Sequence, residues 1–166
     1  MASEGRTARG APAAHEALAR PPIARPGDDE PWPAPAREPM SYPYTTDLAT
    51  IRVIVQRHAV KAGLSEARAI DLVLAVSEVA ANTVRHARSP GNLQIWHDAH
   101  EIICQLHDEG TITDPLAGRR QPSLEARGGH GLWIVNEVCD RVDLRSDETG
   151  TTIRLHMNLP QSSTAC

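Results

Sequence analysis

Apolar residues recur at helical spacing in two consecutive segments of the chain. The first segment follows Thr45-Thr46-Asp47, a typical helix start, and ends at Gly63; Leu48, Ile51, Val55 and Ala59 follow at helical spacing. The second begins at Ser65, a helix-capping residue, and runs to about Ala87; its apolar positions Ile70, Val73, Leu74, Ser77, Ala80, Ala81 and Val84 recur with a 3.6-residue period. The pattern therefore predicts two helices before the helix-breaking run Ser89-Pro90-Gly91-Asn92.

The pattern then changes to short runs that are typical of strands. Leu93–Asp98 and Glu101–His107 are predicted to form two strands joined by a tight turn. A helix over about His130–Cys139 is followed by two further strands, Arg141–Arg145 and Thr151–Leu159. In the last strand apolar and polar residues alternate, which predicts a sheet with one buried and one polar face.

This order of elements favours a two-layer α/β (α+β) sandwich. We expect a mostly antiparallel sheet of four or five strands, with three helices packed on one face. The domain is predicted over residues 41–160, with a flexible C-terminus over 161–166. Residues 1–40 hold eight of the 13 prolines and few large aliphatic residues. Such a segment buries too little apolar surface to offset the entropy of ordering, so we expect a disordered tail.

Composition excludes several classes of protein. The formal net charge of −4 argues against a nucleic-acid binder, which needs a dense basic surface. The sequence has no apolar run of about 18 residues, so no membrane-spanning helix is expected. Its three cysteines are widely spaced and form no Cys-x-x-Cys motif. This argues against a disulfide framework or a zinc site and favours the reducing cytoplasm.

Polar residues that could carry chemistry lie on the second predicted helix and at a strand end. Glu78, Asn82 and His86 recur every four residues, so they share one stripe of the helix. The stripe is either a solvated surface or the floor of a pocket. Asp108 and Gly110 follow a predicted strand. The aspartate is either a turn residue or a carboxylate that accepts a hydrogen bond from a ligand amine.

Glycines open the third predicted helix, in the run Gly128-Gly129-His130-Gly131. A helix N-terminus after such a loop is suited to binding phosphate, although glycine-rich loops also serve as hinges. The run matches neither the dinucleotide fingerprint nor the P-loop. Arg119, Arg120 and Arg127 lie just upstream, where a cationic side chain could reach a phosphate.

In this order, these motifs resemble the ATP-binding superfamily of DNA gyrase, heat-shock chaperone ATPases and sensor histidine kinases. The resemblance covers roughly residues 43–159. Within the superfamily, the compact size and the stretch from Ser77 to Ala87 look most like the bacterial anti-sigma-factor serine kinases. The resemblance implies a histidine kinase-like ATPase fold with ATP and Mg²⁺ as ligands.

The resemblance also implies which residues hold the nucleotide base. Asp108 matches the aspartate that accepts a hydrogen bond from the adenine amino group. Gly110 matches the glycine that packs beneath the purine, and Thr152 matches a threonine that supports the adenine site.

A second set of residues matches the positions around the phosphates. Asn82 corresponds to the asparagine that coordinates Mg²⁺, and Glu78 to the carboxylate proposed as general base. Gly129 and Gly131 match the glycines that line the phosphates, while Arg127 lies where kinase-type members place an arginine against the γ-phosphate.

The resemblance therefore implies a cytoplasmic serine/threonine-protein kinase. It would phosphorylate an anti-sigma-factor antagonist and sequester a sigma factor, with a homodimer as a possible assembly. Two alternatives stay open: a non-catalytic ATP-binding regulatory module, and the detached catalytic domain of a sensor histidine kinase. The absence of a phosphoacceptor hairpin from the sequence disfavours the second alternative.

Overall fold

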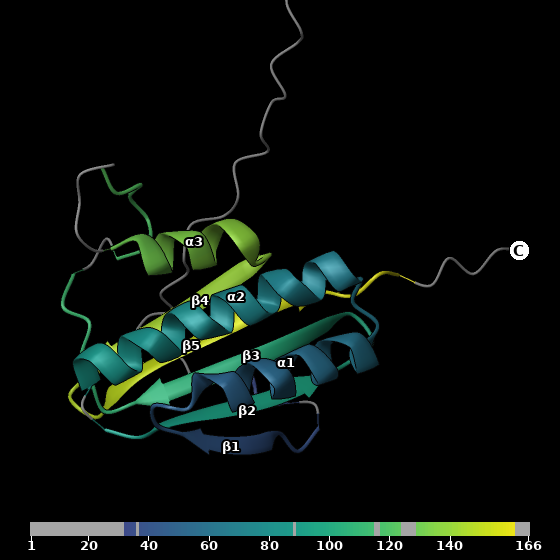
Figure 1. Cartoon of the computed structure of the whole chain (residues 1–166), viewed down its shortest axis with the longest axis horizontal. Helices are drawn as coiled ribbons and strands as arrows, with labels where there is room; N and C mark the ends of the chain where they lie inside the picture. The colour runs from purple at the N-terminus through teal and green to yellow at the C-terminus, as the bar shows by residue number, and fades with distance from the viewer. Residues whose placement is uncertain (1–31, 36, 88, 115–116, 124–128, 162–166) are drawn as a thin grey trace, which may run out of the picture.

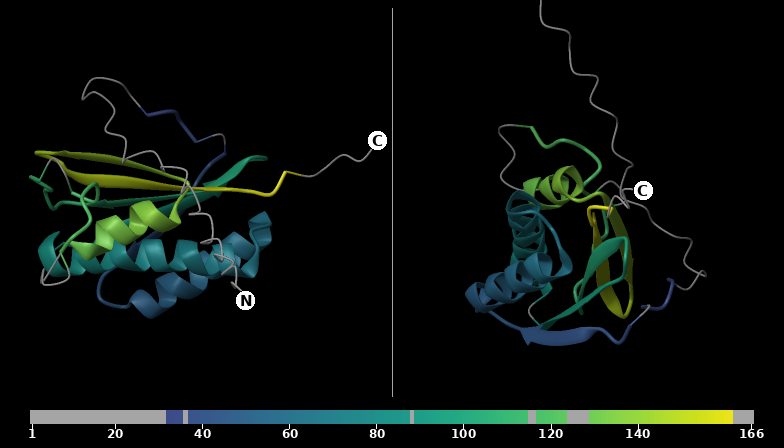
Figure 2. Two further views of the ribbon diagram at one scale, coloured as in Figure 1. Left: turned by 90° about the horizontal axis from the view of Figure 1, so that it is seen from above. Right: turned by 90° about the vertical axis from the view of Figure 1, so that its right-hand side faces the viewer.

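The computed structural model describes residues 32–35, 37–87, 89–114, 117–123 and 129–161 (Figure 1). Its elements are β1 (Met40–Tyr44), α1 (Leu48–Ala62), α2 (Glu66–Asn82), the π-helical turn η1 (Thr83–Ala87), β2 (Gly91–His97), β3 (Glu101–Asp108), α3 (His130–Val138), β4 (Arg141–Asp147) and β5 (Gly150–Asn158). The five strands form one sheet in the order β1-β2-β3-β5-β4, and each neighbouring pair is antiparallel. Figure 2 shows the helices gathered on one face of this sheet. The predicted fold class is confirmed.

The core lies between the helices and the covered face of the sheet. Val55 of α1 and Leu72 of α2 are fully buried against strand residues that include Leu93, Leu106 and Leu155. Two buried thiols, Cys104 and Cys139, belong to the same core, and burial raises the pKa of Cys104. Within the described ranges, no helix combines the length and the hydropathy needed to cross a bilayer.

The predicted helix boundaries follow from local chemistry. The Asp47 carboxylate accepts a hydrogen bond from the Thr50 backbone N–H at 3.3 Å, and the Ser65 hydroxyl accepts one from Arg68 N–H at 3.3 Å. Gly63 ends α1 in the left-handed conformation, with φ at 106°. These capping signals need only neighbours in sequence, which explains why they are readable before the fold is known.

The apolar positions that recur along α2 are only partly the buried positions of the helix. Ile70, Leu74 and Val84 are exposed by 55%, 39% and 38%. The buried positions are instead Ala69, Leu72, Ala75, Val76, Val79 and Ala80. Because α2 lies between α1 and α3 as well as on the sheet, small residues are needed for close helix packing (Figure 1). The apolar residues of α2 lie on several sides of the helix, so their spacing alone does not determine which side is buried.

Two further features lie at or beyond the predicted boundaries. The second predicted helix does reach Ala87, but its last turn is the π-helical η1. Strand β1, which pairs with β2, begins where the sequence suggested only the start of the domain. It is a short edge strand that contains Pro43, and an edge is where a strand tolerates a residue without a backbone N–H.

A short N-terminal segment contacts the helix-free face of the sheet. The Arg154 guanidinium lies 4.6 Å from the centroid of the Trp32 ring and 5.4 Å from that of Trp96. Its Nη1 donates a hydrogen bond to the Pro33 carbonyl oxygen at 2.9 Å. Of the predicted tail over residues 1–40, positions 1–31 and 36 lie outside the described residues.

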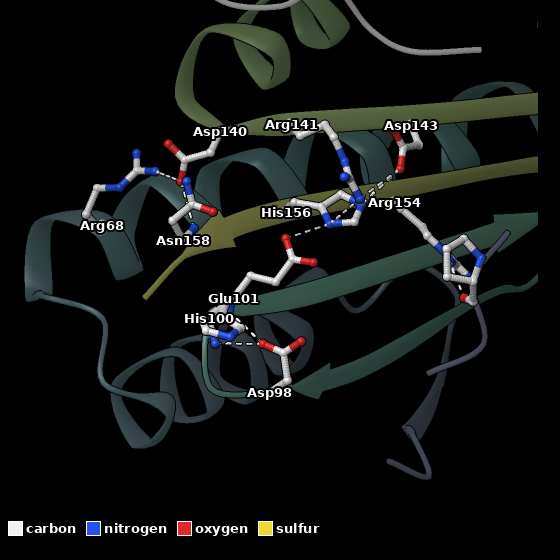
Figure 3. A network of polar contacts seen from close by, with 11 residues as sticks. Arg68, Asp98, His100, Glu101, Asp140, Arg141, Asp143, Arg154, His156 and Asn158 are labelled. Carbon is white, nitrogen blue, oxygen red and sulfur yellow. Dashed lines mark hydrogen bonds and ion pairs between the residues drawn. The ribbon is translucent and has the colours of Figure 1, made fainter. Parts of the chain in front are cut away.

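The same face carries a buried histidine between two carboxylates (Figure 3). The ring nitrogens of His156 lie 3.0 Å from Glu101 Oε2 and 3.0 Å from Asp143 Oδ2. Burial alone would raise the pKa of Asp143. The hydrogen bond from His156 and the charges of His156, Arg141 and Arg154 outweigh burial and hold that pKa below its usual value.

Candidate functional site

A cavity of about 1040 Å³ lies between the helices and one end of the sheet. Residues from the end of α2, from η1, from the end of β3 and from the start of α3 line it. Six of the eight residues that the resemblance assigned to the site are among them: Glu78, Asn82, Asp108, Gly110, Gly129 and Gly131. Segments more than 50 positions apart thus meet in one hollow, which favours the pocket interpretation of the Glu78 stripe over a solvated surface.

Asp108 forms one wall of the cavity at the end of β3. Its Oδ1 accepts a hydrogen bond from the Gly110 backbone N–H at 2.7 Å, and its Oδ2 accepts one from the Thr83 hydroxyl at 2.6 Å. A Cβ at Gly110 would lie 2.9 Å from Asp108 Oδ1 and 3.0 Å from the Ala87 Cβ. The missing side chain at position 110 therefore keeps the space beside the carboxylate open.

Thr151, and not the predicted Thr152, lies in the lining of this cavity. Thr152 does not line the cavity, and its hydroxyl lies 2.9 Å from His107 Nδ1 on the helix-free face. Thr151 does line the cavity and donates a hydrogen bond to the Gly110 carbonyl oxygen at 2.7 Å. Adjacent strand residues point to opposite faces, so a shift of one position moves the hydroxyl across the sheet.

Gly150 allows the turn before β5 to pack against the end of β3. Its φ of 137° lies in the region that favours glycine, and a Cβ there would collide with the Asp108 carbonyl oxygen. The turn before β5 and the end of β3 can therefore approach closely only because position 150 has no side chain.

The opposite part of the cavity is formed where α2 meets α3. A Cβ at Gly131 would lie 2.9 Å from Glu78 Oε2 and 3.7 Å from Asn82 Nδ2. Gly129 takes the left-handed conformation, with φ at 85°, directly before α3. Among the described residues, no side chain caps the first N–H groups of this helix, and such groups favour an anion.

Positive charge in the cavity lining comes from one arginine that the sequence indicated and from one that it did not. Arg127 lies outside the described residues. Arg120 lines the cavity, and so does Arg85, which had no predicted role. Arg85 follows Asn82 by three positions, a helical spacing that could have indicated it. His86 also lines the cavity, as the stripe through Glu78 and Asn82 suggested.

Comparison with known proteins shows that the chain is similar to a family of ATPase domains. The family model described as histidine kinase-like ATPase domain matches residues 43–157. The chain is 26% identical over 114 residues to the serine-protein kinase RsbW of Halalkalibacterium halodurans. The match covers 60% of this chain and 69% of that protein.

A solved structure has a similar fold. It contains the RsbU and RsbW domains of a Mycobacterium tuberculosis protein and matches with a TM-score of 0.52 at 15% identity. The match covers 74% of this chain but only 34% of the other, so the chain spans about a third of that structure. Because the family model matches most of its length, the chain belongs to the histidine kinase-like ATPase domain family.

Proposed function

We propose that the cavity binds ATP together with Mg²⁺ and that the chain is a serine/threonine-protein kinase of the anti-sigma-factor type. Its substrate would be an anti-sigma-factor antagonist, and it would also sequester a sigma factor. The observation that carries the proposal is that Asp108 lies in one cavity with Glu78, Asn82 and the start of α3. The likeness to a protein named serine-protein kinase supports the same conclusion.

Asp108 is suited to the adenine end of the ligand. Its carboxylate can only accept hydrogen bonds, and the exocyclic amine of adenine donates them. Gly110 leaves room for a flat ring beside it. Thr151, which holds the Gly110 carbonyl, takes the supporting role first expected of Thr152.

The α3 end of the cavity is suited to the phosphates. The first N–H groups of α3 follow Gly129 and attract anions. Arg85 and Arg120 add positive charge to the lining. From the resemblance alone, Arg127 is the candidate that contacts the γ-phosphate.

Asn82 and Glu78 fit a magnesium site and a proton acceptor. The Asn82 amide oxygen is a hard ligand of the kind Mg²⁺ prefers, and it would hold the ion beside the phosphates. The bound ion supplies neutralisation of phosphate charge. Glu78, one helical turn before Asn82, would accept the proton of the incoming serine hydroxyl. The serine oxygen then bonds to the γ-phosphorus, the bond from that phosphorus to the β–γ bridging oxygen breaks, and ADP leaves.

A groove on the outer side of α1 and α2 supports the proposal that the chain binds a protein partner. It has a volume of about 750 Å³ and is lined by Val53, Val60 and Val73 together with Arg52, Gln56, Arg57 and Lys61. Val53 and Val60 are exposed by 67% and 54%. An apolar floor with a basic rim complements an amphipathic helix that carries acidic residues, and we propose that the partner protein presents such a helix.

The partner surface has its own test. Val60→Asp should weaken binding of a sigma factor or antagonist from the same genome at least tenfold, because it places a charge on the apolar floor. Ile70→Asp is the matched control, an exposed aliphatic residue on the same helix pair that does not line the groove. Equal binding by the wild type and Val60→Asp would remove this surface from the proposal.

The function itself is tested in two steps. Calorimetric titration with ATP and ADP, with and without Mg²⁺, should show nucleotide binding that Mg²⁺ strengthens. Transfer of radiolabelled phosphate from ATP to candidate antagonist proteins should then label a serine or threonine. If no nucleotide binds, the site assignment fails. If ATP binds without transfer to any candidate, the non-catalytic module replaces the kinase.

A further inference from the structure

A buried chain of hydroxyl groups lies behind the Asp108 carboxylate. The Thr83 hydroxyl is 2.6 Å from Asp108 Oδ2, and the Tyr44 hydroxyl is 3.0 Å from Thr83 Oγ1. Tyr44 is exposed by 4% and Thr83 by 2%. The three residues come from β1, η1 and β3, so the chain connects the edge of the sheet to the wall of the cavity.

The direction of these hydrogen bonds follows from the number of protons. An ionised carboxylate only accepts, so Thr83 must donate its single hydroxyl proton to Asp108. The Val79 carbonyl is a weaker alternative acceptor, at 3.4 Å. Thr83 can then only accept from Tyr44, which makes Tyr44 the donor. Burial raises the pKa of Tyr44 to about 12; the Thr83 hydrogen bond opposes this rise and the charge of Asp108 adds to it. Tyr44 therefore keeps its proton at neutral pH.

The position of Tyr44 depends on a glycine in the neighbouring strand. Tyr44 pairs with Gly91 across β1 and β2. A Cβ at Gly91 would lie 2.7 Å from Tyr44 Cε2, so the ring crosses the strand where no side chain obstructs it. From there the ring directs its hydroxyl into η1, beneath the cavity.

We propose that Thr83 and Tyr44 are positioning residues that hold the Asp108 carboxylate in the orientation that selects a 6-aminopurine. The inference rests on the proposed function, because Asp108 must be the group that contacts the base. With Gly110 N–H on one oxygen and Thr83 on the other, the carboxylate cannot rotate away. The lone pairs that remain can only accept hydrogen bonds, so they favour a C6 amine and disfavour the C6 carbonyl of hypoxanthine or guanine.

The test is the ratio of affinities for ATP and inosine triphosphate, measured by titration calorimetry on the full chain. Thr83→Val keeps the shape of the side chain but removes its donor. It should weaken ATP binding about tenfold and change inosine triphosphate binding little, so that the ratio falls. Thr83→Ser should restore the ratio to within about threefold of the wild type. Tyr44→Phe should lower it by about threefold, because Thr83 loses the donor behind it.

The ratio separates positioning from stability, because an unfolded fraction lowers both affinities equally. Thr50→Val is the matched control, since it also removes a threonine hydroxyl that donates to an aspartate, at 2.7 Å to Asp47, at a position that does not line the cavity. Should Thr83→Val not fold, the ratio in Tyr44→Phe decides the question.

Each outcome has a distinct meaning. An unchanged ratio in Thr83→Val or in Tyr44→Phe overturns the proposal for that residue. If Asp108→Asn loses the preference for ATP while Thr83→Val keeps it, positioning fails and the nucleotide site stands. If Asp108→Asn also keeps the preference, the assignment of Asp108 to adenine has failed.

Discussion

Glu78 Oε2 lies only 2.9 Å from the point that a Cβ at Gly131 would occupy. The carboxylate of α2 and the first turn of α3 therefore meet directly in the cavity. We expect Gly131→Ala to fold, because the displaced atom is the far end of a flexible side chain. Phosphate transfer should nevertheless fall about tenfold, since moving a base by an ångström costs heavily in rate. Transfer assays and a urea unfolding curve check both parts; transfer at the wild-type rate would contradict the proposed place of Glu78.

Replacing the carboxylate itself gives a sharper result. Glu78→Gln should leave ATP affinity nearly intact and lower phosphate transfer by roughly 10²-fold or more, the usual contribution of a positioned base. Calorimetry gives the first quantity and radiolabel transfer the second. If transfer continues at the wild-type rate, another group accepts the proton.

At the adenine end the expected effect is on affinity. Asp108→Asn presents an amide donor where the adenine amine and Thr83 both need an acceptor. Leaving buried polar groups unmatched costs about 1–3 kcal/mol, so ATP affinity should fall about five- to 150-fold. Titration with ATP at fixed Mg²⁺ measures this loss, and an unchanged dissociation constant would exclude Asp108 from the base site.

The metal prediction concerns Asn82. Asn82→Ala should abolish the strengthening of ATP binding by Mg²⁺, because the side chain loses its only oxygen ligand. The measurement is the ratio of ATP affinities with and without Mg²⁺. A ratio equal to that of the wild type would show that Asn82 does not hold the ion.

On the helix-free face, the lowered pKa of Asp143 has a consequence for stability. A carboxyl group whose pKa is lower in the folded protein stabilises it above the unfolded pKa, about 3.9. This stabilisation is lost as the pH falls through the folded value. Asp143→Asn should therefore lower the free energy of unfolding at pH 6 and flatten its decline below pH about 4. Urea unfolding across this range checks both effects, and parallel curves for the two proteins would contradict them.

The parts of the fold that were predictable from the sequence depend on local interactions. Asp47 and Ser65 cap helices through residues three positions away, and Gly63 ends one through its own backbone. The alternation of apolar and polar residues along the last strand was equally predictable from the sequence. It also placed Thr152 on the polar face, so the period of two alone would have indicated Thr151 as the threonine that faces the cavity.

What could not be predicted depends on contacts between distant segments. The inward face of α2 is set by α1 and α3 on its two sides, and Ile70 is apolar without being buried. The link from Tyr44 to Thr83 joins residues 39 positions apart. It requires β1 beside Gly91, and neither the strand nor the glycine's role follows from a local pattern.

The contact of Arg154 with both Trp32 and Trp96 should make tryptophan fluorescence sensitive to the surroundings of this arginine. The sequence has three tryptophans, and the third, Trp133, lies in α3 next to the cavity-lining Leu132. Two fluorophores thus lie on the helix-free face and one lies on α3. Variants that keep a single tryptophan would allow changes around the N-terminal segment and changes at α3 to be recorded as separate spectroscopic signals.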